Sequence, residues 1–203
     1  MSLQRGYPSA PDKQPETFAF TADNMAEARG IIDKYPSGRQ QSAVMPLLYL
    51  VQKQVGWVPV AAMDAVAEML EMPAIGVYEV ATFYTMFNLE PVGRYLVQVC
   101  TTTPCMLRDS DGIVEACMKH LRIGWDQTTA DGNFTLKEVE CLGACVNAPM
   151  VQINDDYYED LTPESIVKLL DALARGERAV AGPQNGRRSS EPLGGATTLK
   201  GGA

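Results

Sequence analysis

The sequence lacks most of the residues on which common catalytic and nucleic-acid-binding sites depend. Its 203 residues include a single histidine, His120, so a metal site with two histidine ligands, such as a Rieske cluster, is excluded. It contains no glycine-rich phosphate-binding motif of the GxGxxG or GxxxxGK(S/T) type, and therefore no nucleotide fingerprint of its own. Basic residues number 17 against 25 acidic ones, and the net charge of −8 argues against a nucleic-acid partner.

The chain also lacks a long apolar run and a recognisable leader. No apolar stretch reaches the roughly 18 residues that a membrane-spanning helix needs, so we expect no direct membrane insertion. The N-terminal segment is polar, carries Asp12 and Glu16, and matches neither a secretory signal nor a transit peptide. Cysteines number 5, an odd count that argues against a disulfide framework and suits a reducing compartment. We therefore predict a cytoplasmic protein.

Apolar residues recur at helical spacing between Asp23 and about Asn88. The pattern predicts short helices over about 23–35, 44–55, 59–72 and 74–87, the second ending at Gly56. Their apolar and aromatic stripes are those of an ordinary packed core. We interpret residues 22–92 as a four-helix bundle, preceded by an N-terminal arm over residues 1–21.

The pattern changes after Pro91–Gly93, and residues 93–176 predict a second domain that mixes strands and helices. Alternating apolar residues predict strands over 94–99, 134–140 and 150–153, and a hairpin leads from the third into Tyr157–Tyr158. Helices are predicted over 111–122 and from Thr162–Pro163 to Gly176. The fold class is therefore α+β. Residues 177–203 are rich in glycine and predict a flexible C-terminal tail that a partner would order.

Four of the cysteines form two close pairs, Cys100-x4-Cys105 and Cys141-x3-Cys145. Each pair follows a predicted strand, so neighbouring strands would place both loops at one end of the sheet. Soft thiolates select zinc, copper(I) or iron–sulfur clusters. The spacing is unusual for zinc and favours a 2Fe–2S cluster. Structural zinc and redox-active thiols remain alternatives, although the absence of a C-x-x-C motif weakens the latter.

Residues around these cysteines suit a cluster. Gly143 and Ala144 are small enough for backbone N–H groups to approach the sulfur atoms, and Thr101–Thr103 offer hydroxyl donors. Glu138 and Glu140 flank Cys141, where their charge would lower a reduction potential, although solvated strand-end carboxylates are as good an interpretation.

Three other residues carry weaker signals. Cys117 is predicted to be a buried, inert thiol within a helix. His120 is interpreted as an ordinary surface or half-buried residue. The isomer of the Ala148–Pro149 bond stays open.

The strings VCTTTPCML and FTLKEVECLGACVNAPM, with VYEVATFYTMFNLEPVG before them, resemble a known family. The chain is similar, from about residue 22 to 175, to the thioredoxin-like 2Fe–2S subunit of respiratory complex I, the NADH:quinone oxidoreductase. The resemblance implies a thioredoxin-like ferredoxin domain with a small mixed sheet. It also implies that Cys100, Cys105, Cys141 and Cys145 ligate one 2Fe–2S cluster, and none of these ligand positions departs from the family pattern.

The same resemblance implies partners. The family associates with a flavoprotein subunit that binds FMN and NADH, beside a further Fe–S subunit of the peripheral arm of this translocase. The chain would be an electron-transfer subunit without a substrate site, peripheral on the inner membrane of a bacterium, and its cluster would be a side acceptor near the flavin. Related subunits occur in NAD-linked formate dehydrogenases and NAD-reducing hydrogenases. A free ferredoxin-like carrier and a zinc-stabilised interaction module are the alternatives from other classes.

Overall fold

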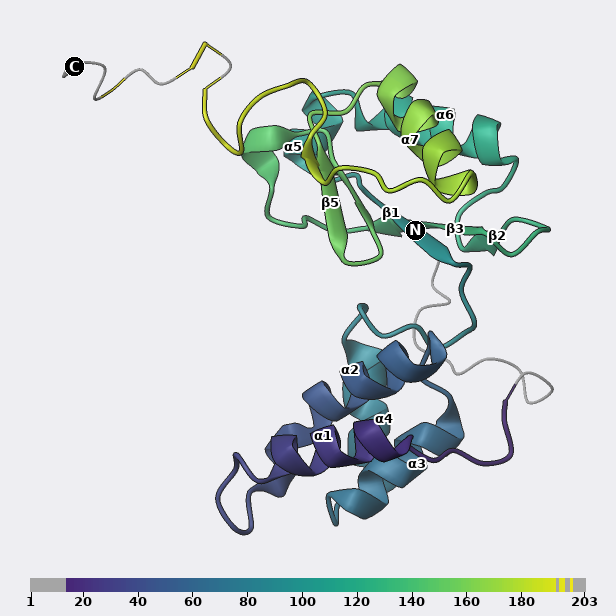
Figure 1. Ribbon diagram of the computed structural model, residues 1–203, viewed down its shortest axis with the longest axis vertical. Helices are drawn as coiled ribbons and strands as arrows, with labels where there is room; N and C mark the ends of the chain where they lie inside the picture. Colours follow the sequence, from purple (N-terminus) through teal and green to yellow (C-terminus); the bar gives the residue numbers. More distant parts are fainter. Residues whose placement is uncertain (1–13, 193, 196–197, 199–203) are drawn as a thin grey trace. The chain divides into compact units, whose positions relative to one another are not determined.

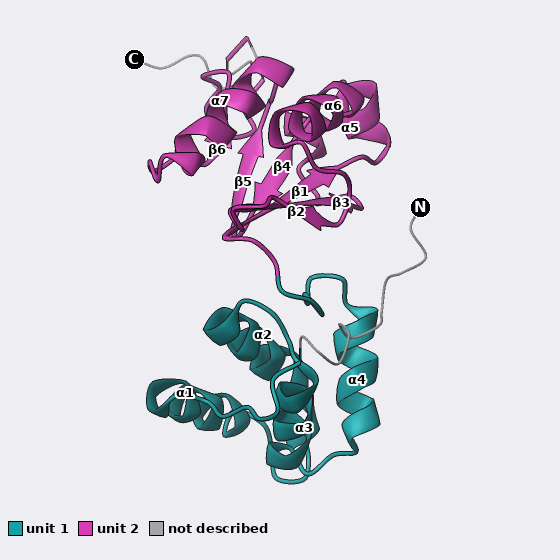
Figure 2. Cartoon of the chain, turned by 90° about the vertical axis from the view of Figure 1, so that its right-hand side faces the viewer, with its two compact units in different colours: residues 1–91 teal, residues 92–203 magenta. Residues whose placement is uncertain are grey.

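The computed structural model describes residues 14–192, 194–195 and 198. The chain divides into two compact units, Met1–Pro91 and Val92–Ala203 (Figures 1 and 2). Within the described part of the chain, no helix is both long and apolar enough to cross a membrane. Most of the predicted N-terminal arm falls on residues 1–13 and lies outside the described residues.

The first unit is helical and closes around one apolar core to which all four α-helices contribute buried residues. Its elements are α1 (Ala22–Ile32), the 3-10 turn η2 (Gln40–Ala43), α2 (Val44–Val55), α3 (Val60–Met69) and α4 (Ala74–Phe83). These positions agree with the predicted periodicity. Gly56 ends α2 with a left-handed φ of 86°, which glycine adopts without a Cβ clash, and Pro46 lies in the first turn of that helix.

The fourth helix ends earlier than predicted, at Phe83 instead of about Phe87. Tyr84 takes an extended backbone, and the following turn buries Phe87, which is 3% exposed. The chain then passes the start of α3, where the Val58 amide donates to the Asn88 carbonyl at 2.8 Å. Burial of Phe87 from a turn gives the same apolar spacing as one more helical turn, which explains the difference.

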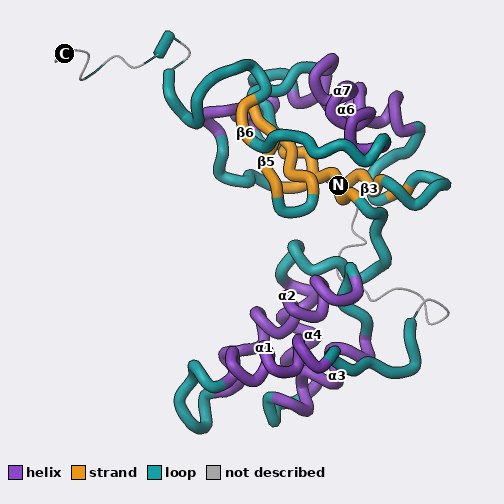
Figure 3. The backbone as a smooth tube through the Cα atoms, viewed as in Figure 1, coloured by secondary structure: helices purple, strands orange, loops and turns teal. Residues whose placement is uncertain are grey.

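The second unit contains a mixed six-stranded sheet in the order β2-β3-β1-β4-β5-β6. Its strands are the orange segments in Figure 3. Its strands are β1 (Tyr95–Cys100), β2 (Gln127–Thr128), β3 (Phe134–Val139), β4 (Val151–Ile153), β5 (Asp156–Glu159) and β6 (Gly182–Pro183). β1 is parallel to β3 and antiparallel to β4, so the predicted mixed sheet is present.

Two helices, α6 (Ser110–Leu121) and α7 (Pro163–Ala174), cover the same face of this sheet (Figures 1 and 2). Their inward side chains pack on the strands in one core, which includes Val97, Val99, Ile113, Leu136, Ile166 and Leu170. α7 begins with a capping box in which the Thr162 and Ser165 side chains each bond the other's backbone amide. Thr162 followed by Pro163 therefore starts the helix as predicted.

The segment that follows β1 and carries Cys105, predicted as a loop, instead contains the short helix α5 (Thr103–Leu107). Pro104 lies in its first turn, where the missing N–H of proline would have no helical partner anyway. A helix of five residues is too short to show a periodic pattern. The same reason explains why the two-residue strands β2 and β6 were not predicted.

The structure also corrects the predicted C-terminal tail, because residues 177–192 have defined positions on the second unit. β6 pairs in parallel with β5, and Arg187 forms an ion pair with Asp160 in which each side chain is 7% exposed. Polar contacts hold this segment, so its composition, poor in apolar residues, gave a misleading signal. Most of the predicted tail beyond residue 192 lies outside the described residues.

Candidate metal centre

The four paired cysteines lie at one end of the sheet. β1 and β3 are parallel neighbours, with Cys100 opposite Val139, so the loops that follow them leave the same edge. Cys100 is the last residue of β1, and Cys141 follows β3 after one intervening residue. The predicted adjacency of the two cysteine loops is therefore confirmed.

The first pair is buried. Cys100 is 2% exposed, and Cys105, within α5, is 1% exposed. They share a small apolar cluster with Ala148 and Met150, separate from the main core of the unit. These apolar side chains exclude water from one side of the thiol pair. Electrostatic interactions are stronger where water is excluded.

The second pair is exposed. Cys141 and Cys145 have their Sγ atoms 3.4 Å apart, and the Gly143 amide lies 3.4 Å from the Cys141 Sγ atom. Gly143 has a φ of 84°, a conformation that L side chains rarely adopt. The glycine therefore allows the tight loop that turns a backbone N–H toward sulfur, as predicted from its small size.

The thiols influence one another's protonation. Burial by itself raises the pKa of Cys100, but hydrogen bonds from the Thr102 hydroxyl and amide, the Cys105 thiol and the Leu142 amide lower it overall. The pKa of Cys105 is raised to about 12 by burial, by the bond to Cys100 and by that thiolate's charge. The pKa of Cys145 is raised first by its bond to Cys141. Several thiolates so close together need a cationic centre to coexist.

Contacts between the loops hold this arrangement. The Leu142 amide, from the second loop, lies close enough to the Cys100 sulfur of the first to lower the pKa of that thiol. The Leu142 carbonyl accepts a hydrogen bond from the Tyr157 hydroxyl of β5 at 2.9 Å. Sequence analysis predicted the hairpin that carries Tyr157 but not the contact of its hydroxyl with Leu142, because that contact joins residues 15 positions apart.

The neighbouring threonines divide their roles. The Thr102 Oγ1 atom lies 3.1 Å from the Cys100 Sγ atom, as a hydroxyl donor to sulfur would. The Thr101 hydroxyl instead donates to Glu138 at 2.9 Å and so ties the ends of β1 and β3 together. The Ala148–Pro149 bond, which sequence analysis left open, is cis.

Two further residues singled out from the sequence lie in α6. Cys117 is fully buried in the core under α6, and burial raises its pKa to about 12. His120 places its Nε2 atom 2.9 Å from an Asp171 carboxylate oxygen and thereby joins α6 to α7. Both observations agree with ordinary structural roles.

In the metal-free chain, iodoacetamide is expected to modify Cys141 and Cys145 well before Cys117. Alkylation consumes thiolate, and burial both covers Cys117 and raises its pKa from 9.0 to about 12. At pH 8, a thiol with a pKa of about 12 has roughly a thousandfold less thiolate than one with a pKa of about 9. Timed labelling followed by peptide mass spectrometry measures the order. Equal labelling rates for Cys117 and Cys141 would contradict the burial of the Cys117 side chain.

The grouping of the thiols suits a binuclear cluster. The thiols stand as a buried pair and an exposed pair at one end of the sheet. A binuclear cluster takes two thiolates at each iron atom. The donor set, with its N–H groups aimed at sulfur, fits such a cluster.

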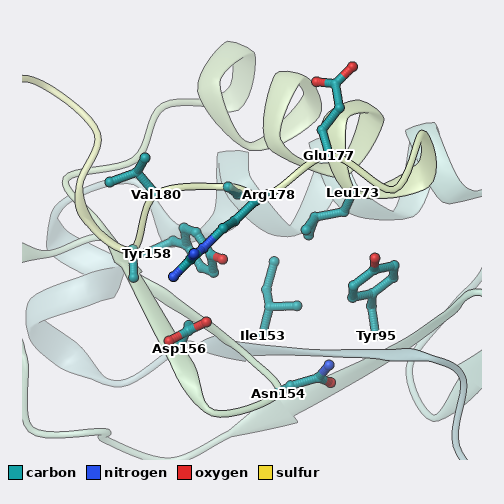
Figure 4. A pocket seen from close by; sticks show the side chains of 11 residues that line it. Tyr95, Ile153, Asn154, Asp156, Tyr158, Leu173, Glu177, Arg178 and Val180 are labelled. Atoms are coloured by element: carbon teal, nitrogen blue, oxygen red, sulfur yellow. The ribbon is translucent and has the colours of Figure 1, made fainter.

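A cavity of ≈ 500 Å³ lies elsewhere on the same unit (Figure 4). Its lining includes Tyr95, at the start of β1, and Asn154, in the turn between β4 and β5. None of its lining residues is a cysteine, so it is separate from the thiol centre.

Two pairs of thiols at the adjoining ends of β1 and β3, in a small mixed sheet with two helices on one face, define a protein of the iron–sulfur electron-carrier class. Residues 28–174 match the family model described as thioredoxin-like 2Fe-2S ferredoxin, and the chain belongs to this family.

Curated relatives extend over most of the chain. It is 59% identical over 156 residues, 76% of this chain and 88% of the relative, to an NADH-quinone oxidoreductase subunit of Rickettsia prowazekii (strain Madrid E). It is 48% identical over 199 residues, 98% of this chain and 81% of the relative, to the mitochondrial NADH dehydrogenase (ubiquinone) flavoprotein 2 of Dictyostelium discoideum.

A solved structure has a similar fold. The crystal structure of an NAD+-reducing NiFe hydrogenase in the H2-reduced state superposes with a TM-score of 0.57 at 19% identity. The match covers 65% of this chain and 22% of the hydrogenase chain. At this identity, the similarity concerns the fold alone.

Proposed function

We propose that this chain is the 2Fe–2S electron-transfer subunit of an NADH:quinone oxidoreductase of the complex I type. The observation that carries the proposal is the meeting of two cysteine pairs at one sheet edge, in a chain closely related to proteins named as subunits of that enzyme. The missing nucleotide fingerprint fits a subunit that receives electrons from a partner and binds no substrate itself.

Cys100 and Cys105 would hold one iron atom and Cys141 and Cys145 the other, as their arrangement in pairs suggests. When bound, the cluster would accept and release one electron at a time. Two backbone N–H groups of the chain would offset the negative charge of the thiolates: the Gly143 amide, which donates to the Cys141 sulfur, and the Leu142 amide, which lowers the pKa of Cys100.

Exposed apolar residues beside the cysteines provide a surface for a partner. Met106 and Leu107 follow Cys105 and are 49% and 75% exposed, and Val146 follows Cys145 and is 67% exposed. Apolar side chains left in water around a redox centre suit burial by another subunit. We assign this surface, called the cluster rim, to contact with a flavoprotein subunit that binds FMN and NADH.

The remaining parts of the chain fit an assembly. We assign the helices of residues 22–92 as a four-helix bundle, whose exposed Ile75 and Phe83 would meet neighbouring subunits, among them a further Fe–S subunit of the peripheral arm. The complex would lie on the cytoplasmic face of a bacterial inner membrane and pass electrons to quinone.

Chemical analysis of the purified full-length chain tests the proposal. Iron and acid-labile sulfide are each expected at about two per chain, as one 2Fe–2S cluster requires. One zinc and no iron would show that the centre is a structural metal site. Purification from native membranes gives the assembly: a quinone reductase supports complex I, whereas a hydrogenase or formate dehydrogenase would reassign the chain.

A further inference from the structure

The segment Gly182–Glu191, called the strap, follows α7 and crosses to the second cysteine loop. It begins as β6, in parallel pairing with β5, and the Gln184 amide continues the pairing to the Glu159 carbonyl at 2.9 Å. From there the strap reaches Val146 and Asn147, the two residues directly after Cys145. A segment distant in sequence therefore contacts the loop that carries the exposed thiol pair.

The guanidinium of Arg187 is the centre of this contact. Its Nε and Nη2 atoms donate to both carboxylate oxygens of Asp160, at 2.9 and 2.6 Å. Nη2 also donates to the Val146 carbonyl at 2.9 Å, and Nη1 donates to the Glu191 carbonyl at 3.2 Å. The planar fork of arginine matches a carboxylate at two points while donors remain for carbonyl groups, which lysine cannot reproduce.

Asn147 makes the second contact. Its side-chain amide donates to the Ser189 carbonyl of the strap at 2.9 Å. Its backbone carbonyl accepts a hydrogen bond from the Asp160 backbone amide at 2.8 Å. The residue is 2% exposed. The cysteine loop is thus held near its start, where Tyr157 bonds the Leu142 carbonyl, and just beyond its end, where the strap bonds Val146 and Asn147.

We propose that Arg187 is a positioning residue for the cluster, acting through the backbone of Val146 on Cys145. The inference rests on the proposed function, since it assigns Cys145 as an iron ligand. An exposed ligand pair has no surrounding core to fix its geometry, so the geometry must come from bonds to the loop backbone. Partners that orient metal ligands in this way commonly change metal affinity about 10- to 100-fold when they are removed.

The test uses the full-length chain carrying its cluster, with R187A and R187K compared with R188A. Arg188 is exposed, so R188A removes the same charge one residue away without touching Val146 or Asp160. Iron release to a ferrous chelator is expected to be about 10- to 100-fold faster for R187A and clearly faster for R187K. The electron paramagnetic resonance spectrum of the reduced cluster is expected to shift for both Arg187 variants and to stay unchanged for R188A.

The spectrum separates positioning from general stabilisation, because a merely less stable protein keeps the same cluster geometry while it is folded. Faster iron release with an unchanged spectrum in R187A and R187K would overturn the inference. If R187A does not fold, R187K decides, because its ammonium still neutralises Asp160, and a wild-type spectrum for R187K would again overturn it. A wild-type chain without a cluster overturns the proposed function and this inference with it, whereas variants that match a cluster-bearing wild type overturn this inference alone.

Discussion

Cys105→Ala is expected to abolish the cluster, and Cys117→Ala is expected to leave it intact. Iron content of the first variant falls from about two atoms per chain to background, since a 2Fe–2S centre needs all four ligands. Cys105 is buried beside Cys100, so no solvent-exposed side chain can take its place. Cys117 is equally buried but lies in the core under α6, which makes it the matched control for the loss of a buried thiol.

Serine replacements should separate the two cysteine pairs. A serine ligand must lose a proton of much higher pKa than a thiol, and burial raises that pKa further. Burial already raises the pKa of the Cys105 thiol to about 12, so Cys105→Ser is expected to lose the cluster. Cys141 is exposed, where water stabilises the alkoxide, so Cys141→Ser is expected to keep a cluster with an altered absorption spectrum.

Iron and sulfide analysis with visible absorption measures each variant. A full cluster in Cys105→Ala, or loss of the cluster in Cys117→Ala, would show that the ligands are assigned wrongly. Equal losses in Cys105→Ser and Cys141→Ser would contradict the distinction between a buried and an exposed pair.

The part of the structure that sequence analysis predicted rests on repeated local patterns. The apolar spacing of α1 to α4 and the alternation in β1 and β3 each involve several residues, so each gives a usable signal. The cysteine pairs were identified because chemistry and spacing coincide in Cys100, Cys105, Cys141 and Cys145. Their meeting followed from one assumption, that β1 and β3 are neighbours, and the parallel register confirms it.

What sequence analysis missed depends on single polar contacts between distant residues. Arg187 and Asp160 are separated by 27 positions, and nothing in the sequence pairs them. A glycine-rich segment has the composition of a linker whether or not one arginine anchors it. Tyr157 and Asn147 were overlooked for the same reason, because tyrosine and asparagine near a hairpin have many ordinary roles.

NADH is expected to reduce the cluster only when the flavoprotein partner is bound. The chain has no nucleotide fingerprint, and the cavity at the Tyr95 end of β1 lies apart from the thiol centre. A hydride donor gives electrons in pairs, so a flavin must accept them and pass them on singly to a cluster. The isolated chain with NADH should therefore stay oxidised, whereas the bound chain should exchange electrons to an extent set by its potential.

The cluster rim allows a sharper form of this test. Leu107 is 75% exposed beside Cys105, and Val180, away from the cysteine loops, is 82% exposed. Leu107→Asp places a charge in the proposed contact and should weaken association about tenfold or more, equivalent to about 1.4 kcal/mol. Val180→Asp introduces the same charge at a similarly exposed site and should bind normally. Titration of the flavoprotein with each cluster-bearing variant, followed by the bleaching of cluster absorption after NADH addition, measures both effects. Reduction of the isolated chain by NADH would refute the division of labour, and equal behaviour of the two aspartate variants would place the partner on another surface.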